Sequence, residues 1–188
     1  MPLSRSLSWK LDWYRQSELE GALLLGKAVR AASDPALMVA LVGHAADEAD
    51  HARQWAQTCQ ALGGPWVRIL RGYQSFYADF DVLPASLSEI LALTHVFERR
   101  VWRQFQQELS SSDWPTVART TFERLVADER QHLEWVRTWL AGQPDGESLV
   151  ARYAAIDEQV YARLEPCEYR LWEVPGLGIE LEPRGAAA

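Results

Sequence analysis

Two short segments, far apart in the chain, carry the same pattern of ionisable residues. Residues 46–51 and 127–132 both read Ala-Asp-Glu-x-x-His. In a helix, a residue and the third one after it lie on one face, so the Glu and His of each copy can reach a single metal ion. The chain has only four histidines, and two of them fall in this repeat. The pattern therefore predicts metal ligands.

The residues around both copies predict that these side chains face a core. Apolar side chains recur at helical spacing on the face of each Glu. For Glu48 they are Leu37, Leu41, Ala45, Ala52, Trp55 and Cys59; for Glu129 they are Ala118, Phe122, Leu125, Leu133, Val136 and Leu140. Buried carboxylates lose their hydration and are driven toward protonation, so several acids that face one another require cations.

Two further segments can each add one carboxylate. Glu98 lies on an apolar stripe and precedes Glu129 by 31 residues. Near the N-terminus there are two candidates, Glu18 and Glu20. Glu18 lies among apolar residues and precedes Glu48 by 30 residues, whereas Glu20 lies on the polar side. We therefore choose Glu18.

Helix start and stop signals divide the chain into five helical segments, and no run alternates as a strand would. The predicted fold class is all-α. The helices are expected at residues 7–32, 35–62, 86–110, 113–142 and 147–171. We expect one domain over residues 1–172, with a core bundle at 7–142, followed by an extended or flexible tail at 173–188.

The links between helices predict their order in space. Short links after the first and third helices force antiparallel hairpins, whereas residues 63–85 are long enough to cross the whole length of a helix. The predicted architecture is two hairpins joined by one long crossover. Aromatic residues in the crossover and fifth helix could cover a substrate pocket, or could equally form a homodimer interface.

This set of residues resembles the ferritin-like di-iron carboxylate superfamily, whose motif is E, ExxH, E, ExxH over four helices. The match covers roughly residues 7–142. The resemblance implies a ferritin-like four-helix bundle that holds two iron ions, or Mn and Fe. Four carboxylates would balance the charge of two divalent cations. The implied ligands are Glu18 and Glu98 as terminal carboxylates, Glu48 and Glu129 as bridging carboxylates, and His51 and His132 as nitrogen donors.

Four more residues are candidates for the surroundings of the ligands. The resemblance implies that Asp47 orients His132 and that Asp128 orients His51 across the bundle. His44 lies one turn before Glu48, similar to the extra histidine of arylamine N-oxygenases in the superfamily, and His95 lies three residues before Glu98. For both histidines, an ordinary core or surface position is the alternative.

Ligands of this kind serve several reactions, so the resemblance implies a class of activity. The preferred function is an O2-activating oxidase or oxygenase, an enzyme with O2 or peroxide, a small-molecule substrate and an external electron donor as partners. The alternatives are a ferroxidase or iron-storage protein, whose substrate is Fe(II), and a peroxide-scavenging relative of rubrerythrin that lacks a rubredoxin domain.

Composition argues against other classes. Cys59 and Cys167 form no Cys-x-x-C pair, which argues against a zinc or rubredoxin site. A formal net charge of -7 argues against binding to nucleic acid. The sequence shows neither a leader-like segment nor an apolar run long enough to cross a membrane, so a cytoplasmic location is expected.

Overall fold

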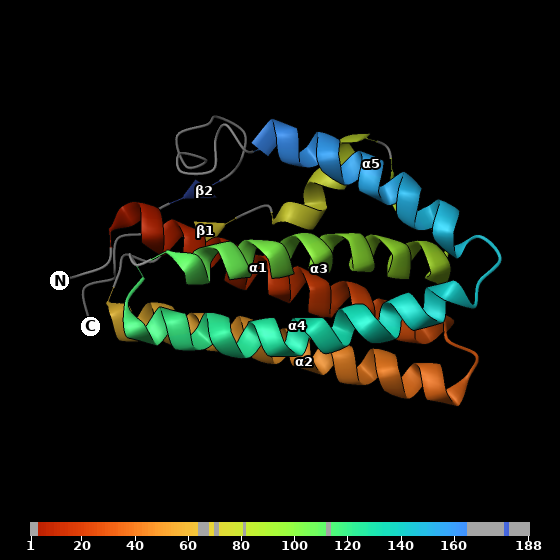
Figure 1. Ribbon diagram of the computed structural model, residues 1–188, viewed down its shortest axis with the longest axis horizontal. Helices are drawn as coiled ribbons and strands as arrows, with labels where there is room; N and C mark the ends of the chain where they lie inside the picture. The colour runs from red at the N-terminus through yellow and green to blue at the C-terminus, as the bar shows by residue number, and fades with distance from the viewer. Residues whose placement is uncertain are drawn as a thin grey trace.

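Four long helices run side by side along the longest axis of the computed structural model (Figure 1). The structure describes residues 4–63, 68–69, 72–80, 82–111, 114–164 and 179–180. The long helices are α1 (Arg5–Ala28), α2 (Pro35–Leu62), α3 (Leu87–Ser110) and α4 (Thr116–Ala141). The shorter ones are α5 (Gly146–Leu164) and the 3-10 helices η1 (Val29–Ala31) and η2 (Tyr73–Phe80). The predicted all-α fold is confirmed, and in the described part of the chain no helix has the length and hydropathy needed to cross a membrane.

Local sequence signals fix the ends of α2 and α3. The Asp34 carboxylate accepts a hydrogen bond from the backbone N–H of Ala36 at 3.1 Å, at the start of α2. Gly63 ends α2 in the left-handed region, with φ of 64°, which glycine adopts without steric cost. At the start of α3, Ser86 and Glu89 each accept a hydrogen bond from the other's backbone N–H.

Three features differ from the sequence prediction or extend beyond it. The end of the first predicted helix tightens into η1, as helix ends often do. Residues 165–171, the predicted end of the fifth helix, lie outside the described residues. The structure also contains one two-residue strand pair, in which β1 (Arg68–Ile69) runs antiparallel to β2 (Ile179–Glu180), and the all-α class is unchanged by it. Two-residue strands are too short to show an alternating pattern.

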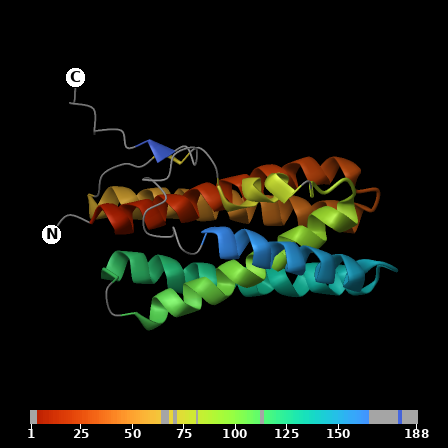
Figure 2. The ribbon, with the colours of Figure 1, turned by 90° about the horizontal axis from the view of Figure 1, so that it is seen from above.

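The helices pack as two antiparallel hairpins. α1 packs against α2 and α3 packs against α4, while the crossover between the hairpins brings the chain back along the bundle through η2. As a result, α2 and α3 run in the same direction (Figure 1). α5 packs along α3 and contacts η2, and Figure 2 shows α5 in blue along the outside of the green α3.

One layer of the core takes an aromatic ring from each long helix. The four rings belong to Tyr14, Trp55, Phe105 and Phe122, and each of these residues is at most 3% exposed. The ring centroids of Trp55 and Phe122 lie 4.8 Å apart, and those of Phe105 and Phe122 lie 5.3 Å apart. The layer therefore fixes all four helices relative to one another near one end of the bundle.

Candidate metal centre

The six ligands predicted from the sequence meet on the inward faces of the four long helices. All six side chains are buried, each between 1% and 4% exposed. They are Glu18 on α1, Glu48 and His51 on α2, Glu98 on α3, and Glu129 and His132 on α4.

One group of donors contains three carboxylates and one imidazole. Glu18, Glu48, His51 and Glu129 each offer a donor atom within 4.8 Å of all the others. His51 Nδ1 lies 3.8 Å from Glu48 Oε1 and 3.4 Å from Glu129 Oε1. Metal–ligand bonds of about 2.0–2.6 Å place donors of one ion at separations of this size, so the group can enclose one cation.

A second group shares Glu48 and contains two imidazoles. His44, Glu48, Glu98 and His132 also offer donor atoms within 4.8 Å of one another. His44 Nε2 lies 2.7 Å from Glu98 Oε1, and His132 Nδ1 lies 3.3 Å from Glu48 Oε1. His132 Nδ1 is also 3.9 Å from Glu129 Oε2, so the two groups form one continuous cluster.

His44 lies among the donors rather than around them. It is 2% exposed, its ring centroid lies 3.8 Å from that of His132, and the half-buried Trp135 ring contacts it edge-on. The signal was present in the sequence: His44 precedes Glu48 by four residues and therefore lies on the same helix face. An ordinary core or surface position was the alternative for His44, because histidines in general are only partly buried. That general tendency takes no account of the predicted ligands that lie next to His44.

Two carboxylates on the opposite helix face the outer nitrogens of the ligand histidines. His51 Nε2 lies 3.3 Å from Asp128 Oδ2, and His132 Nε2 lies 3.3 Å from Asp47 Oδ2. A histidine that coordinates a cation through Nδ1 carries its proton on Nε2 and donates it outward. These are the cross-bundle pairings predicted from the sequence, and they hold both rings in orientation.

The structure does not bring His95 to the cluster. His95 lines a cavity of about 440 Å³ beside α5, together with Arg137, Leu140 and Gly146. Burial and the positive charges of Arg99 and Arg137 lower the pKa of His95 to about 4. The three-residue spacing from Glu98 does not decide this, because Glu48 and His51 have the same spacing and both lie in the cluster.

Glu20, the rejected candidate on α1, has a separate contact. Its Oε1 accepts a hydrogen bond from the Gly72 backbone N–H at 2.8 Å. A Cβ atom at position 72 would lie 2.5 Å from the Glu20 carboxylate, so glycine permits this close approach. The contact ties the crossover to α1, and no sequence signal on the polar face of α1 predicted it.

Apolar layers enclose the cluster along the bundle axis. The aromatic layer lies one or two helical turns from the ligands on one side. On the other side, a residue seven positions from each predicted Glu ligand is at most 1% exposed: Leu25, Leu41, Leu91 and Val136. Water is therefore kept away from both ends of the site.

Between α1 and α3, the cluster adjoins a very small cavity. It is lined by Glu48, Glu98, Gly21, Gln74 and other residues, and it has a volume of about 10 Å³. This is room for one water-sized molecule. A Cβ atom at Gly21 would lie 2.8 Å from Glu48 Oε2, so glycine leaves the space that this carboxylate occupies.

Without metal, protons balance the charge of the cluster. Burial, together with the nearby Glu48 and Glu129, raises the pKa of Glu18 well above its usual range. Burial opposes protonation of His44 and His132, but the surrounding carboxylates prevail and raise their pKa values to about 9 and about 12. Burial alone would raise the pKa of Glu48, but the neighbouring His132 and His44 lower it.

Several buried donor atoms in the cluster have no hydrogen-bond partner. Among the described residues, the buried side-chain atoms without a hydrogen-bond partner include seven from the two donor groups: His44 Nδ1 and Nε2, Glu48 Oε1, His51 Nδ1, Glu98 Oε2, Glu129 Oε2 and His132 Nδ1. Buried polar atoms normally have a partner, and an unsatisfied one costs about 1–3 kcal/mol. The other seven such atoms belong one each to residues outside these groups, so the residues that could hold a cation contribute half of the total. The donor set therefore fits a dinuclear metal centre.

No protein-family model, curated protein or solved structure matches this chain.

Proposed function

We propose that this chain is a ferritin-like di-iron carboxylate protein that holds two iron ions, or one Mn and one Fe, and reacts with O2 or peroxide. One observation carries the proposal. Two groups of buried donors, each with its donor atoms within 4.8 Å of one another, share Glu48, and seven of their buried atoms have no hydrogen-bond partner.

The donor types favour Fe or Mn. Carboxylate oxygens make up most of the first group and half of the second, and the rest are imidazole nitrogens. Neither group contains a thiolate, whereas structural zinc is usually held by four ligands that include cysteine. Oxygen donors with one or two histidines suit redox-active Fe or Mn. In addition, the four carboxylates cancel the charge of two divalent ions.

The protein would hold and isolate the metals. When bound, a pair of ferrous ions supplies two electrons, enough to reduce O2 to peroxide, or peroxide to two waters with two protons. Asp47 and Asp128 keep the Nδ1 atoms of His132 and His51 directed inward. The two apolar layers exclude water, which strengthens the charge interactions inside the site.

The reaction that we prefer is that of an oxidase or oxygenase. A second candidate, a ferroxidase or peroxide scavenger, is favoured by the size of the cavity beside Glu48 and Glu98. A space of about 10 Å³ admits a small oxidant but not an organic substrate. An oxygenase would therefore have to move the side chains of Gln74 or Phe97 to bring a substrate to the donors.

Metal stoichiometry tests the dinuclear centre. Anaerobic titration of metal-free protein with Fe(II) should saturate near two ions per chain, and Glu48→Ala should prevent formation of the coupled pair because Glu48 belongs to both groups. Glu134→Ala, an exposed change on α4, serves as the matched control and should keep two ions. Saturation of the wild-type chain at one ion would rule out a dinuclear site.

Assembly size, iron loading and the oxidant consumed distinguish the candidate functions. A storage protein should assemble into a large shell and accumulate many irons per chain, which sedimentation and iron analysis detect. A peroxide scavenger should consume peroxide in single turnover faster than O2. An oxidase or oxygenase should remain a small species and consume O2 only while an electron donor is supplied. Loading beyond a few irons per chain would overturn the oxygenase preference.

A further inference from the structure

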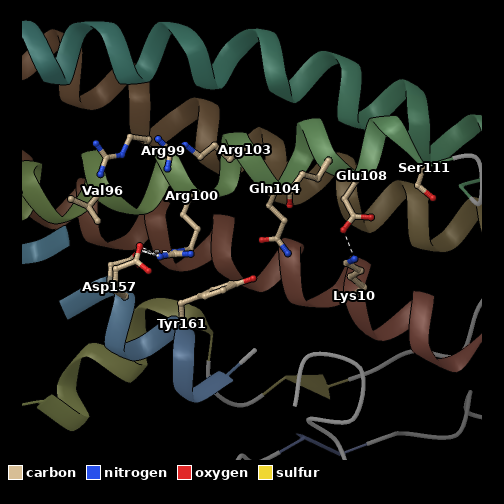
Figure 3. Close-up of a pocket in the computed structure, with 12 residues that line it drawn as sticks. Lys10, Val96, Arg99, Arg100, Arg103, Gln104, Glu108, Ser111, Asp157 and Tyr161 are labelled. Carbon is tan, nitrogen blue, oxygen red and sulfur yellow. Dashed lines mark hydrogen bonds and ion pairs between the residues drawn. The ribbon is translucent and has the colours of Figure 1, made fainter. Parts of the chain in front are cut away.

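A second cavity lies on the outer side of α3, and none of its residues belongs to the candidate metal centre. Its volume is about 410 Å³. α3 forms its floor, Lys10 of α1 closes one end, and Asp157 and Tyr161 of α5 form the other side (Figure 3). Apart from Val96 and the ring of Tyr161, every residue that lines it is charged or carries an amide or hydroxyl group.

The acidic residues in this cavity already have cationic partners. Glu108 pairs with Lys10, and both of these side chains are largely buried. Asp157 and Glu158 pair with Arg100 at 2.5 Å and 2.8 Å. The Arg100 guanidinium also lies 4.1 Å above the Tyr161 ring. These pairs account for the negative charge of the lining.

Two arginines remain without a carboxylate. Arg99 and Arg103 both line the cavity, one helical turn apart on α3, and neither contacts an acidic group within the described residues. Figure 3 shows their side chains leaving α3 on the side nearer to α4, away from Arg100 and Asp157. Like charges at this spacing repel and destabilise a helix. An anion between them would remove that repulsion.

We propose that the edge of this cavity nearer to α4 binds a small polyanion, either a phosphate or a dicarboxylate, between Arg99 and Arg103. Guanidinium groups present planar forks of N–H donors that match carboxylate and phosphate oxygens. The volume lies in the range of small-molecule sites. Because the chain carries a formal charge of -7, its surface as a whole repels anions, so binding must come from this local cluster.

Calorimetric titration of the metal-loaded protein tests the proposal. The probes are inorganic phosphate and succinate, each measured against sodium chloride at matched ionic strength, so that general charge screening is subtracted. Wild type should bind at least one of the two probes with a Kd in the millimolar range or tighter, and the better probe identifies the anion class. Arg99→Gln combined with Arg103→Gln should weaken binding at least tenfold, because each change removes a charge-assisted hydrogen bond.

The control is Arg124→Gln, which removes one exposed arginine from α4 and should leave binding unchanged. Circular dichroism melts of all variants show whether each one is folded, and the single changes Arg99→Gln and Arg103→Gln replace the double variant if it melts early. No heat of binding with either probe would overturn the proposal. Equal affinity in the wild type and the arginine variants would place the anion elsewhere, including at the metals, and would also overturn it.

Discussion

Raising the pH should destabilise the metal-free protein, because the folded cluster holds protons that the unfolded chain releases. The pKa of His44 is raised from 6.5 to about 9, and that of His132 is raised to about 12. A group with a raised folded pKa contributes stability below its unfolded pKa and loses that contribution as pH rises through the folded value. Glu18 and Glu98, whose pKa values are also raised, act with the same sign from lower pH upward.

The expected size follows from His44 alone. One pKa unit corresponds to 1.36 kcal/mol, so a shift from 6.5 to about 9 is worth about 3 kcal/mol of unfolding free energy. The His44 side chain is fully buried, so solvent does not screen this interaction. Metal-free protein should therefore lose about 2–3 kcal/mol of stability between pH 6.5 and 9. Bound metal replaces the protons with fixed positive charge, and the loss should largely disappear.

Urea unfolding at several pH values, with and without Mn(II), measures both effects. The control variant is His44→Gln, which removes one titrating ring and should make the dependence on pH shallower. If metal-free stability stays flat between pH 6.5 and 9, the carboxylates do not hold protons on these histidines, and the account of the cluster's charge is wrong.

Three further changes have separate expected outcomes. Gly21→Ala puts a Cβ atom 2.8 Å from Glu48 Oε2, so metal affinity should fall about tenfold. Metal-free stability should hold or rise, because alanine favours helix over glycine by about 1 kcal/mol. Calorimetry measures the affinity and thermal melts measure the stability; an unchanged affinity would contradict the argument that the Cβ atom crowds Glu48. Asp128→Asn should weaken metal binding about 10–100-fold with little effect on stability, and an unchanged affinity would remove its orienting role. Asp157→Ala leaves Arg100 without its buried partner and should cost about 3–5 kcal/mol in urea unfolding; a loss below about 1 kcal/mol would show that α5 does not depend on this contact.

The helices and the inward position of the six clustered side chains could be predicted from the sequence because both depend on local periodicity. The choice of Glu18 over Glu20 rested on the apolar residues one turn away, and the structure buries Glu18 and directs Glu20 to the backbone of Gly72. The pairings of Asp47 and Asp128 were expected from the family resemblance, and the structure places each carboxylate 3.3 Å from the histidine expected for it. In these cases a short sequence pattern contains all the geometry.

The remaining features depend on contacts between distant segments. Asp157 accepts hydrogen bonds from Tyr73 and Tyr77 of η2 and pairs with Arg100 of α3, which joins α5 to the rest of the fold. Nothing near Asp157 in the sequence distinguishes it from a solvated helix residue. For the same reason, His44 and His95 could not be ranked as metal ligands before the helix packing was known. Only the packing of α2, α3 and α4 decides which ring faces the cluster.

In the proposed dinuclear centre, the sharing of Glu48 has a consequence for how the two metal positions fill. A carboxylate common to both groups makes the two binding events thermodynamically linked, since the first ion changes the charge and orientation that the second one meets. Variants that each lack one carboxylate should therefore differ in how many metal positions they affect. Glu18 and Glu98 each belong to one group, so their loss affects one position first. Loss of Glu48 should affect metal binding at both positions. It should also weaken the coupling, so that the affinity for one ion depends less on whether the other is bound.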